Sequence, residues 1–436
     1  MKLPERGLDR NEIARQLEAM KQGDGDIANA RLFSLAYPTR DDVLDVAKVA
    51  YATFFSENAL NPMTFPSLRR MEAEVVAMAL SLFHGPDGAA GTMTSGGSES
   101  LLLAVKTARD HARKARPEVR DPEMLIPITA HPALLKAAHL LDVKPVFVPV
   151  TPAFTADVEA ARALASDQTI LVVGSAPQYP HGVIDPIADL AALAVDKHAL
   201  CHVDACVGGF FLPWVEALGT PLPPWDFRVP GVTSISADLH KYGYAAKGAS
   251  VVLHRTRALR RNQIFAYGDW PGGLFGSPSI LGTRPGGAIA AAWAVMRYLG
   301  REGYVALAKR SLEATRVIAE GVRSIPGMAI LGAPVMSILS FASDTHDLFV
   351  VGDRMQEKGW RIDRQQRPTS LHLTISPAHD AVAARFVDDL RDATSTPTGE
   401  PSGAAAMYGM LGSLPDRAIV NDAILDFMDG LHEVET

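Results

Sequence analysis

The sequence predicts an α/β fold with a mainly parallel sheet in a large domain, followed by a small α+β C-terminal domain. The first observation is that short runs rich in Val, Ile and Leu alternate with Ala-rich stretches of helical periodicity. Strands separated by helices imply right-handed crossovers, and therefore parallel strands. The second is the length of 436 residues, which is enough for two domains. The third is the composition, with 47% hydrophobic and 21% charged residues, which is typical of a folded protein.

The predicted elements of the large domain follow one another along the middle of the chain. The β-prone runs lie at residues 125–129, 145–150, 170–174, 200–203, 232–236 and 250–254. Helical segments are expected at residues 132–141, 156–165, 187–195 and 288–299. In sheets of this kind ligands bind at the carboxyl ends of the strands, so the loops after the strands are where a site is expected.

Further elements are predicted on both sides of this domain. Upstream, apolar residues recur at helical spacing from Thr39 to Phe54 and from Leu68 to Leu82. Downstream, the predicted helices and strands lie at residues 304–323, 328–331, 335–341, 347–358, 361–363, 370–375, 379–393 and 419–431. We therefore divide the chain into an N-terminal arm (1–66), a large α/β domain (67–300) and a small α+β domain (301–436).

Charge and composition exclude several classes of function. The formal net charge is −7, without a long run of one sign, which argues against nucleic-acid binding and against a basic membrane patch. Cys201 and Cys206 are the two cysteines, too few for a disulfide scaffold or a four-ligand metal site, so no metal is expected. No signal peptide and no apolar stretch of membrane-spanning length are recognised. The sequence therefore predicts a soluble, cytoplasmic protein.

A glycine- and serine-rich turn, TSGGSES at residues 94–100, leads into an apolar helix. Glycine lets the backbone approach a ligand, and the first amides of a helix are unpaired donors with partial positive charge. Ser95, Gly96 and Gly97 therefore have the form of a phosphate-binding cradle. A Gly-Gly turn with a serine cap is also a common structural element, so this alternative stays open. The turn matches neither the GxxxxGK[ST] nor the GxGxxG pattern, which argues against nucleotide cofactors.

Three more residues each follow a predicted strand: His131, Asp204 and Lys241. Alone, each has an ordinary explanation as a structural histidine, an N-cap or a surface lysine. A strand-end carboxylate can also pair with a protonated pyridine nitrogen, a histidine can stack on a planar ring, and a lysine of lowered pKa can attack a carbonyl. Together with the cradle, these are the contacts that pyridoxal 5′-phosphate requires. The four features together therefore favour a pyridoxal 5′-phosphate site more strongly than any one of them alone.

Five segments carry a resemblance to a known family: TSGGSES, PQYPHGVIDP, HVDACVGG, SISADLHKYGYAAKG and GTRPGG. They are similar to the matching segments of the sphingosine-1-phosphate lyases, in the group II decarboxylase branch of the fold type I pyridoxal-phosphate enzymes. The resemblance runs from about Tyr37 to about Met410. The lysine and PQYP segments are specific to the lyases, whereas TSGGSES and the aspartate are shared with the decarboxylases.

The resemblance implies a role for each residue around the cofactor. Lys241 would bind pyridoxal 5′-phosphate covalently, Asp204 would pair with its ring nitrogen, and His131 would stack on the ring. Its phosphate would be bound by Ser95, Gly96, Gly97, His240 and, from the second subunit of a homodimer with shared active sites, Thr283 of the partner subunit.

The same resemblance implies a substrate site. Lys247 would bind a phosphate carried by the substrate. The cavity would be lined by Tyr37, Asn58, Tyr179 and Tyr408, and the cavity tyrosines, such as Tyr179, are candidate acid or base groups together with Lys241. One position departs from the family pattern: Asn61 stands where the lyases usually have a histidine involved in handling the substrate phosphate.

The implied activity is cleavage of the C2–C3 bond of sphingosine 1-phosphate and related phosphorylated sphingoid bases, giving a long-chain aldehyde and phosphoethanolamine. The animal lyases carry an N-terminal membrane anchor, and this sequence resembles a soluble form without one. An L-amino-acid decarboxylase of the same branch is the alternative, although Lys247 argues against it. A catalytically inactive binding protein is a third hypothesis, against which the presence of Lys241, Asp204 and His131 argues.

Overall fold

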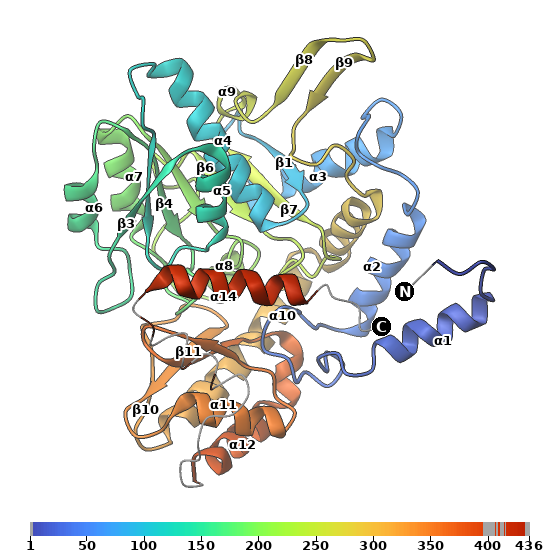
Figure 1. The fold of residues 1–436 in the computed structure, drawn as a ribbon, viewed down its shortest axis with the longest axis vertical. Helices are drawn as coiled ribbons and strands as arrows, with labels where there is room; N and C mark the ends of the chain where they lie inside the picture. The colour runs from blue at the N-terminus through green and yellow to red at the C-terminus, as the bar shows by residue number, and fades with distance from the viewer. Residues whose placement is uncertain (1–2, 396–405, 407–408, 410–413, 415, 432–436) are drawn as a thin grey trace.

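The structure is a computed structural model that describes residues 3–395, 406, 409, 414 and 416–431. Its centre is a mixed sheet with the strand order β1–β7–β6–β5–β4–β2–β3 (Figure 1). The strands are β1 (Ala90–Thr94), β2 (Glu123–Pro127), β3 (Lys144–Val148), β4 (Thr169–Ser175), β5 (Leu200–Asp204), β6 (Ser234–Ala237) and β7 (Ser250–His254). Strands β6, β5, β4, β2 and β3 are parallel, and β7 runs antiparallel to both β1 and β6. The predicted, mainly parallel sheet is confirmed.

Helices connect these strands and pack around the sheet (Figure 1). They are α4 (Gly97–Ala115), α5 (Ala133–Leu141), α6 (Val158–Leu164), α7 (Ile187–Asp196), α8 (Leu212–Ala217) and α9 (Arg257–Arg261). Short apolar strands that are buried along their whole length, such as β2 and β4, are what a parallel sheet covered by helices requires. The sequence predictions for α5, α6 and α7 are confirmed to within a few residues, whereas β1 was not predicted as a strand.

The N-terminal region forms three helices, α1 (Arg10–Met20), α2 (Asp41–Thr53) and α3 (Pro66–Leu82). The last two pack against one long helix, α10 (Gly286–Arg323). The predicted α2 and α3 are confirmed, and both contact α10. The two helices expected at residues 288–299 and 304–323 are merged into α10. Gly300 interrupts it with a φ of 51°, a left-handed conformation that glycine adopts without steric cost.

A second sheet forms the centre of the C-terminal unit, with the antiparallel order β10–β11–β13–β12. Its elements are β10 (Met328–Ile330), β11 (Ile338–Ser343), α11 (Leu348–Glu357), β12 (Asp363–Gln365), β13 (Ser370–Thr374), the 3-10 helix η1 (Pro377–Ala381) and α12 (Ala383–Ser395), followed by α14 (Arg417–Gly430). The core of this unit also contains Phe33 from the N-terminal arm. The arm therefore packs against both units, and the three-part division of the chain stays a prediction.

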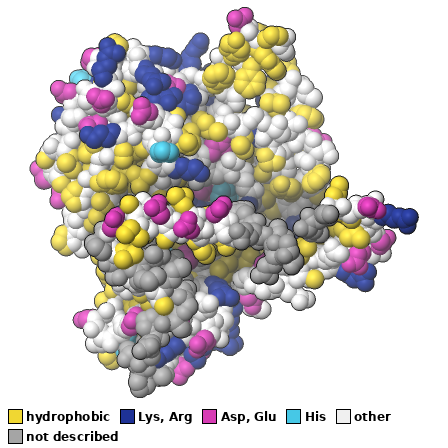
Figure 2. All heavy atoms as spheres, in the orientation of Figure 1, with side chains coloured by type: hydrophobic (Ala, Val, Ile, Leu, Met, Phe, Trp, Pro, Cys, Tyr) yellow, Lys and Arg dark blue, Asp and Glu magenta, His cyan; other side chains and the backbone are white. Residues whose placement is uncertain are grey.

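A hairpin of β8 (Phe265–Trp270) and β9 (Gly273–Ser277) projects from the large unit (Figure 1). Figure 2 shows hydrophobic side chains gathered on it, and Leu274 is 91% exposed. Such an exposed apolar hairpin is a feature of surfaces that bind another protein. Among the helices that the structure describes, none is long and apolar enough to cross a membrane.

Candidate active site

The strand ends meet at one edge of the large sheet. Because β7 is antiparallel to both β1 and β6, the carboxyl ends of β1, β5 and β6 lie on the same side. A cavity of about 350 Å³ lies there. Its lining includes seven of the predicted residues, namely Ser95, Gly96, Gly97, His131, Asp204, His240 and Lys241. The structure thus brings together residues that span nearly 150 positions of sequence.

The cradle is formed by the start of α4. Gly97 has to be glycine, because a Cβ atom there would lie 2.8 Å from Asp238 Oδ2 and 3.0 Å from Cys206 Sγ. The first-turn amides of α4 lack acceptors within the helix and can therefore bind an anion. Ser95 donates its backbone N–H and its hydroxyl to Glu99 Oε2, at 2.6 and 2.8 Å, so its hydroxyl is engaged within the chain.

Glu99 was not identified from the sequence, yet it anchors the cradle. Its second oxygen accepts the backbone N–H groups of Ile280 and Leu281, at 2.7 and 3.2 Å. A single buried carboxylate thereby joins the turn before α4 to the loop that precedes Thr283. Nothing in the local sequence indicates a contact over this distance.

Asp204 is the last residue of β5 and is buried at the back of the cavity. Its Oδ1 accepts the backbone N–H of Cys206 at 3.0 Å, which fixes the orientation of the carboxylate. His131 lies at the exposed side of the cavity, and its Nδ1 accepts the N–H of Ala133 at 3.1 Å. The carboxylate and the imidazole thus line the same cavity, each held by a backbone amide.

Lys241 has a buried partner that sequence analysis missed. Its Nζ lies 3.0 Å from Asp238 Oδ2, and His240 Nε2 lies 3.7 Å from the same oxygen. Burial alone lowers the pKa of Lys241, as the sequence analysis anticipated, but the Asp238 carboxylate, together with Tyr37 and Cys206, outweighs burial and raises it. Burial raises the pKa of Asp238, and the charges of Lys241 and His240 outweigh it, so that its pKa is lowered. An acidic residue three positions before the lysine is the signal that could have revealed the pair.

Asp238→Asn is expected to lower the stability of the cofactor-free protein by about 3 kcal/mol at neutral pH, because it leaves a buried ammonium without its partner. The raised pKa of Lys241 stabilises the fold fully below its unfolded value of about 10.4 and loses this effect at higher pH. The lowered pKa of Asp238 stabilises it above about pH 4 and loses its effect in acid. The difference in melting temperature between variant and wild type should therefore be largest from about pH 4 to pH 10.

A double-mutant cycle is the control for this prediction. In a Lys241→Met background the ammonium is absent, and Asp238→Asn should cost much less. An equal loss of stability in both backgrounds would show that the Asp238 side chain acts through other contacts.

Of two predicted tyrosines, Tyr37 lies close to this pair, and Tyr179 lies close to Tyr37 and to Asp363. Burial raises the pKa of Tyr37 to about 12, although the charge of Lys241 opposes it. Tyr179 donates its hydroxyl to Asp363 Oδ2 at 2.7 Å, and burial together with the Asp363 charge raises its pKa further. Asp363, on β12 of the C-terminal unit, also accepts the hydroxyl of Ser34 at 3.0 Å. Both tyrosines therefore keep their protons at neutral pH.

Lys247 stands beside the N-terminal arm. Its Nζ donates to the carbonyl oxygens of Leu35 at 2.8 Å and His240 at 3.3 Å, and lies 5.2 Å from the centre of the Tyr37 ring. Burial and the nearby charge of Lys241 lower the pKa of Lys247. Because its side chain is still exposed, its charge is available to an anion that enters from solvent.

Six of the predicted residues that the structure describes do not line this cavity: Tyr37, Tyr179 and Lys247, described above, and Asn58, Asn61 and Thr283. Asn58 pairs with Pro285 in a β-bridge, and Asn61 caps a local turn by accepting the N–H of Met63 at 2.9 Å. Thr283 is exposed in the loop before α10. Neither asparagine nor Thr283 lines the cavity around Lys241. Tyr408 lies outside the described residues, so its predicted role stays untested.

The residues around the cavity fit pyridoxal 5′-phosphate. The start of α4 offers backbone donors without side-chain bulk at Gly97, which suits a phosphate. Asp204 offers a fixed carboxylate for a ring nitrogen, and Lys241 offers an amine for the aldehyde. Asp238 Oδ1 is buried beside the lysine and has no hydrogen-bond partner among the described residues. This oxygen can therefore accept a hydrogen bond from a bound ligand.

Comparison with known proteins agrees with this geometry. Residues 36–343 match the pyridoxal-dependent decarboxylase conserved domain. The chain is 41% identical to the sphingosine-1-phosphate lyase of Oryza sativa subsp. japonica, over 98% of this chain and 81% of the relative. A solved Burkholderia pseudomallei sphingosine-1-phosphate lyase superimposes with a TM-score of 0.91 at 38% identity, covering 100% of this chain and 98% of that one. A Lactobacillus brevis glutamate decarboxylase shares the fold, with a TM-score of 0.78 at 21% identity over 91% of this chain and 94% of that one. The chain therefore belongs to the pyridoxal-dependent decarboxylase family and, within it, to the sphingosine-1-phosphate lyases.

Proposed function

We propose that this protein is a pyridoxal 5′-phosphate-dependent lyase that cleaves the C2–C3 bond of sphingosine 1-phosphate and related phosphorylated sphingoid bases. The observation that carries this proposal is the meeting of Lys241, Asp204 and the start of α4 in one cavity of a chain that belongs to this lyase family. The products are a long-chain aldehyde and phosphoethanolamine.

Each residue of the cavity has a proposed task towards the cofactor. Lys241 binds it covalently, and Asp204 holds a proton on its ring nitrogen. His131 covers the ring from the exposed side. The amides at the start of α4, at Gly96 and Gly97, bind the phosphate together with His240. Because Ser95 donates to Glu99, we assign Ser95 to shaping the cradle, with its hydroxyl free to bind the phosphate only if it leaves Glu99.

The bound cofactor withdraws electrons from the bond that breaks. The proton of the 3-hydroxyl leaves, the C2–C3 bond breaks, the aldehyde departs, and C2 gains a proton. Tyr179 already donates to Asp363, so its oxygen is left to accept a hydrogen bond from the 3-hydroxyl. Tyr37 keeps its proton and can donate. Proton transfer is therefore assigned to Lys241, whose Nζ lies 3.0 Å from Asp238 Oδ2.

A direct assay separates the lyase from the alternative activity. The protein is incubated with sphingosine 1-phosphate and, separately, with a panel of L-amino acids, and both aldehyde and carbon dioxide are measured. We expect aldehyde from the phosphorylated sphingoid base alone. Carbon dioxide from an amino acid without any aldehyde would instead support the decarboxylase, with which this chain shares its fold.

Lys247→Gln is expected to raise KM for the phosphorylated substrate by roughly 10- to 100-fold, the effect of losing one charge-assisted hydrogen bond. Glutamine keeps a donor for the carbonyl oxygen of Leu35, so the arm stays in place. The unphosphorylated sphingoid base should be affected much less. Lys247→Arg keeps the charge and serves as the control. Equal losses for both substrates would assign Lys247 to holding the arm rather than to binding phosphate.

We further propose that the active sites are completed in a homodimer, by Thr283 of the partner subunit. The exposed apolar side chains of the β8–β9 hairpin, including Phe265, Trp270 and Leu274, lie shortly before this loop in the chain and supply a surface for association. The proposal also accounts for the exposure of Thr283 outside the cavity of its own chain.

A further inference from the structure

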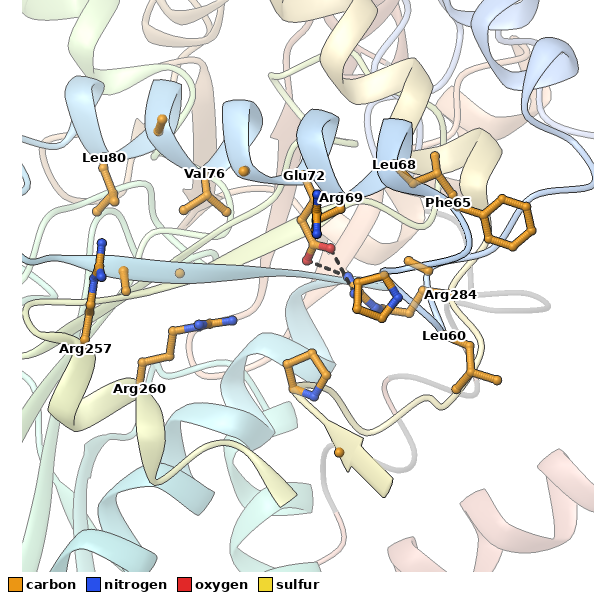
Figure 3. Close-up of a pocket in the computed structure, with 18 of the residues that line it drawn as sticks. Leu60, Phe65, Leu68, Arg69, Glu72, Val76, Leu80, Arg257, Arg260 and Arg284 are labelled. Carbon is orange, nitrogen blue, oxygen red and sulfur yellow. Dashed lines mark hydrogen bonds and ion pairs between the residues drawn. The ribbon is translucent and has the colours of Figure 1, made fainter. Parts of the chain in front are cut away.

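A second cavity lies between α3, β1, α9 and the loop after β9, away from the strand ends. Its volume is about 650 Å³, and none of its described lining residues is shared with the cavity around Lys241. Figure 3 shows α3 along one side, with Arg257 and Arg260 reaching towards it from α9 on the other. We call this cavity the arginine groove, because Arg69, Arg257, Arg260 and Arg284 all line it.

The arginine groove carries a positive charge that the protein does not neutralise. Glu72 is the acidic residue of its lining, and both of its oxygens are bound by Arg284, at 2.6 and 2.9 Å. Within the described ranges, Arg69, Arg257 and Arg260 form no ion pair. Burial lowers the pKa of Arg260, and the charges of Arg284 and Arg257 lower it further, against the opposite effect of Glu72. These guanidinium groups repel one another, and an anion between them would relieve the repulsion.

The guanidinium of Arg284 adds an unused donor. Its side chain is 93% buried, and its Nε has no hydrogen-bond partner among the described residues. A buried donor of a charged group is costly to leave unpaired, so such a group is often explained by a missing ligand. Arg260 has only a neutral partner for its Nε, the hydroxyl of Thr92 at 3.0 Å, which leaves its two terminal nitrogens directed to the groove.

The opposite wall is elongated and mostly apolar, and the Glu72–Arg284 ion pair interrupts it. Leu68, Val76 and Leu80 line it along one face of α3, and Phe65 lies just before that helix. Figure 3 shows Val76 and Leu80 pointing from the helix into the groove. The alanines at positions 73 and 77 leave room between the larger side chains. From Leu68 to Leu80 the helix rises by roughly 18 Å, which is enough to cover an extended alkyl chain. A long apolar wall beside a cluster of guanidinium groups can bind a ligand that has an alkyl chain and an anionic head group.

We propose that the arginine groove binds a single-chain anionic amphiphile, with its phosphate or carboxylate head group between Arg257 and Arg260 and its alkyl chain along α3. Arg257 and Arg260 are three positions apart and so lie on one face of α9, where two guanidinium groups can grip one anion. Long-chain alkyl phosphates and long-chain fatty acids share this chemistry. The groove is a second site on the chain and does not depend on the proposed lyase activity.

The test is isothermal titration calorimetry on the holoenzyme with decyl phosphate, decanoate, decanol and inorganic phosphate. The double variant Arg257→Ala/Arg260→Ala removes the head-group site, and Ala77→Phe fills the apolar wall but keeps the arginines. Arg261→Ala is the matched control, since Arg261 is an exposed residue of the same helix that does not line the groove. Lys247→Gln removes the proposed phosphate site of the active centre instead.

We expect the double variant and Ala77→Phe each to weaken binding of an anionic amphiphile by about tenfold or more, with Arg261→Ala unchanged. Comparing the affinities for decyl phosphate and decanoate identifies the preferred head group. Decanol, which lacks the anionic head, and inorganic phosphate, which lacks the alkyl chain, should both bind far more weakly. KM for the lyase substrate should stay at its wild-type value in the double variant. If Lys247→Gln leaves KM for the lyase substrate unchanged, the proposed role of Lys247 in substrate binding is wrong. That result does not bear on the arginine groove, which is tested by the amphiphile affinity of the double variant.

Two results would overturn the proposal. One is equal affinity of the wild type and the double variant for both anionic amphiphiles. The other is a double variant that changes its oligomeric state, measured by light scattering, without any change in ligand affinity. The latter result would show that a second copy of the chain closes the groove, which adjoins the Thr283 loop through Arg284.

Discussion

Lys241→Ala is expected to lower turnover by roughly 10³-fold or more, because no other group of the cavity replaces the amine that binds the cofactor. The variant should also lose the visible absorption of the covalently bound cofactor, and the cofactor should be removed by gel filtration. The measurements are a kcat determination with sphingosine 1-phosphate and an absorption spectrum before and after filtration.

Lys136→Ala is the matched control, because Lys136 is an exposed lysine of α5 outside the cavity. It should keep wild-type turnover and colour. If Lys241→Ala kept both its activity and its absorption, Lys241 would have to be removed from its role. A wild-type protein that stays colourless after incubation with pyridoxal 5′-phosphate would contradict the cofactor assignment altogether.

Asp204→Asn is expected to reduce kcat by roughly 10²- to 10³-fold, since a neutral amide cannot hold a proton on the ring nitrogen and so weakens electrostatic stabilisation of the charge that develops. The substitution is nearly isosteric, and the side-chain oxygen can still accept the N–H of Cys206. The fold should therefore persist. Steady-state kinetics and the affinity for the cofactor would be measured together.

The control is Asp157→Asn, at the N-terminus of α6, where the aspartate accepts the N–H of Ala160. Asparagine is an equally good cap, so neither stability nor activity should change. If Asp204→Asn lowered cofactor affinity but left kcat intact, Asp204 would serve to bind the ring rather than to activate it.

Much of the fold could be predicted because its signals are local. The runs that form β4 and β5 are apolar, β-branched and short, and the helices between them show regular periodicity. The β8–β9 hairpin was missed because its exposed aromatic and glycine-rich sequence has no alternation that points to a core. The break between the two helices predicted at residues 288–299 and 304–323 is confirmed, because Gly300 has a non-helical conformation that kinks α10.

The residues of the site that could be predicted are those whose position follows from the order of strands and loops along the chain. His131, Asp204 and Lys241 follow strands of one sheet, and a parallel sheet gathers such residues at one edge. The partners of these residues depend on folding at long range. Asp363 reaches Tyr179 across 184 positions, and Glu99 reaches Ile280 across 181. No spacing rule relates residues so far apart, and the same holds for the raised pKa of Lys241, which depends on how deeply Asp238 is buried.

The Glu99 carboxylate has a consequence for the homodimer proposed above. It accepts two donors from Ser95 and two from the loop at Ile280 and Leu281, so the cradle and the loop share one set of hydrogen bonds. If Thr283 of that loop completes the neighbouring site, cofactor affinity and subunit affinity become thermodynamically linked, each strengthening the other by the same factor. Apoprotein should accordingly dissociate at a higher concentration than holoenzyme, and dilution should release cofactor.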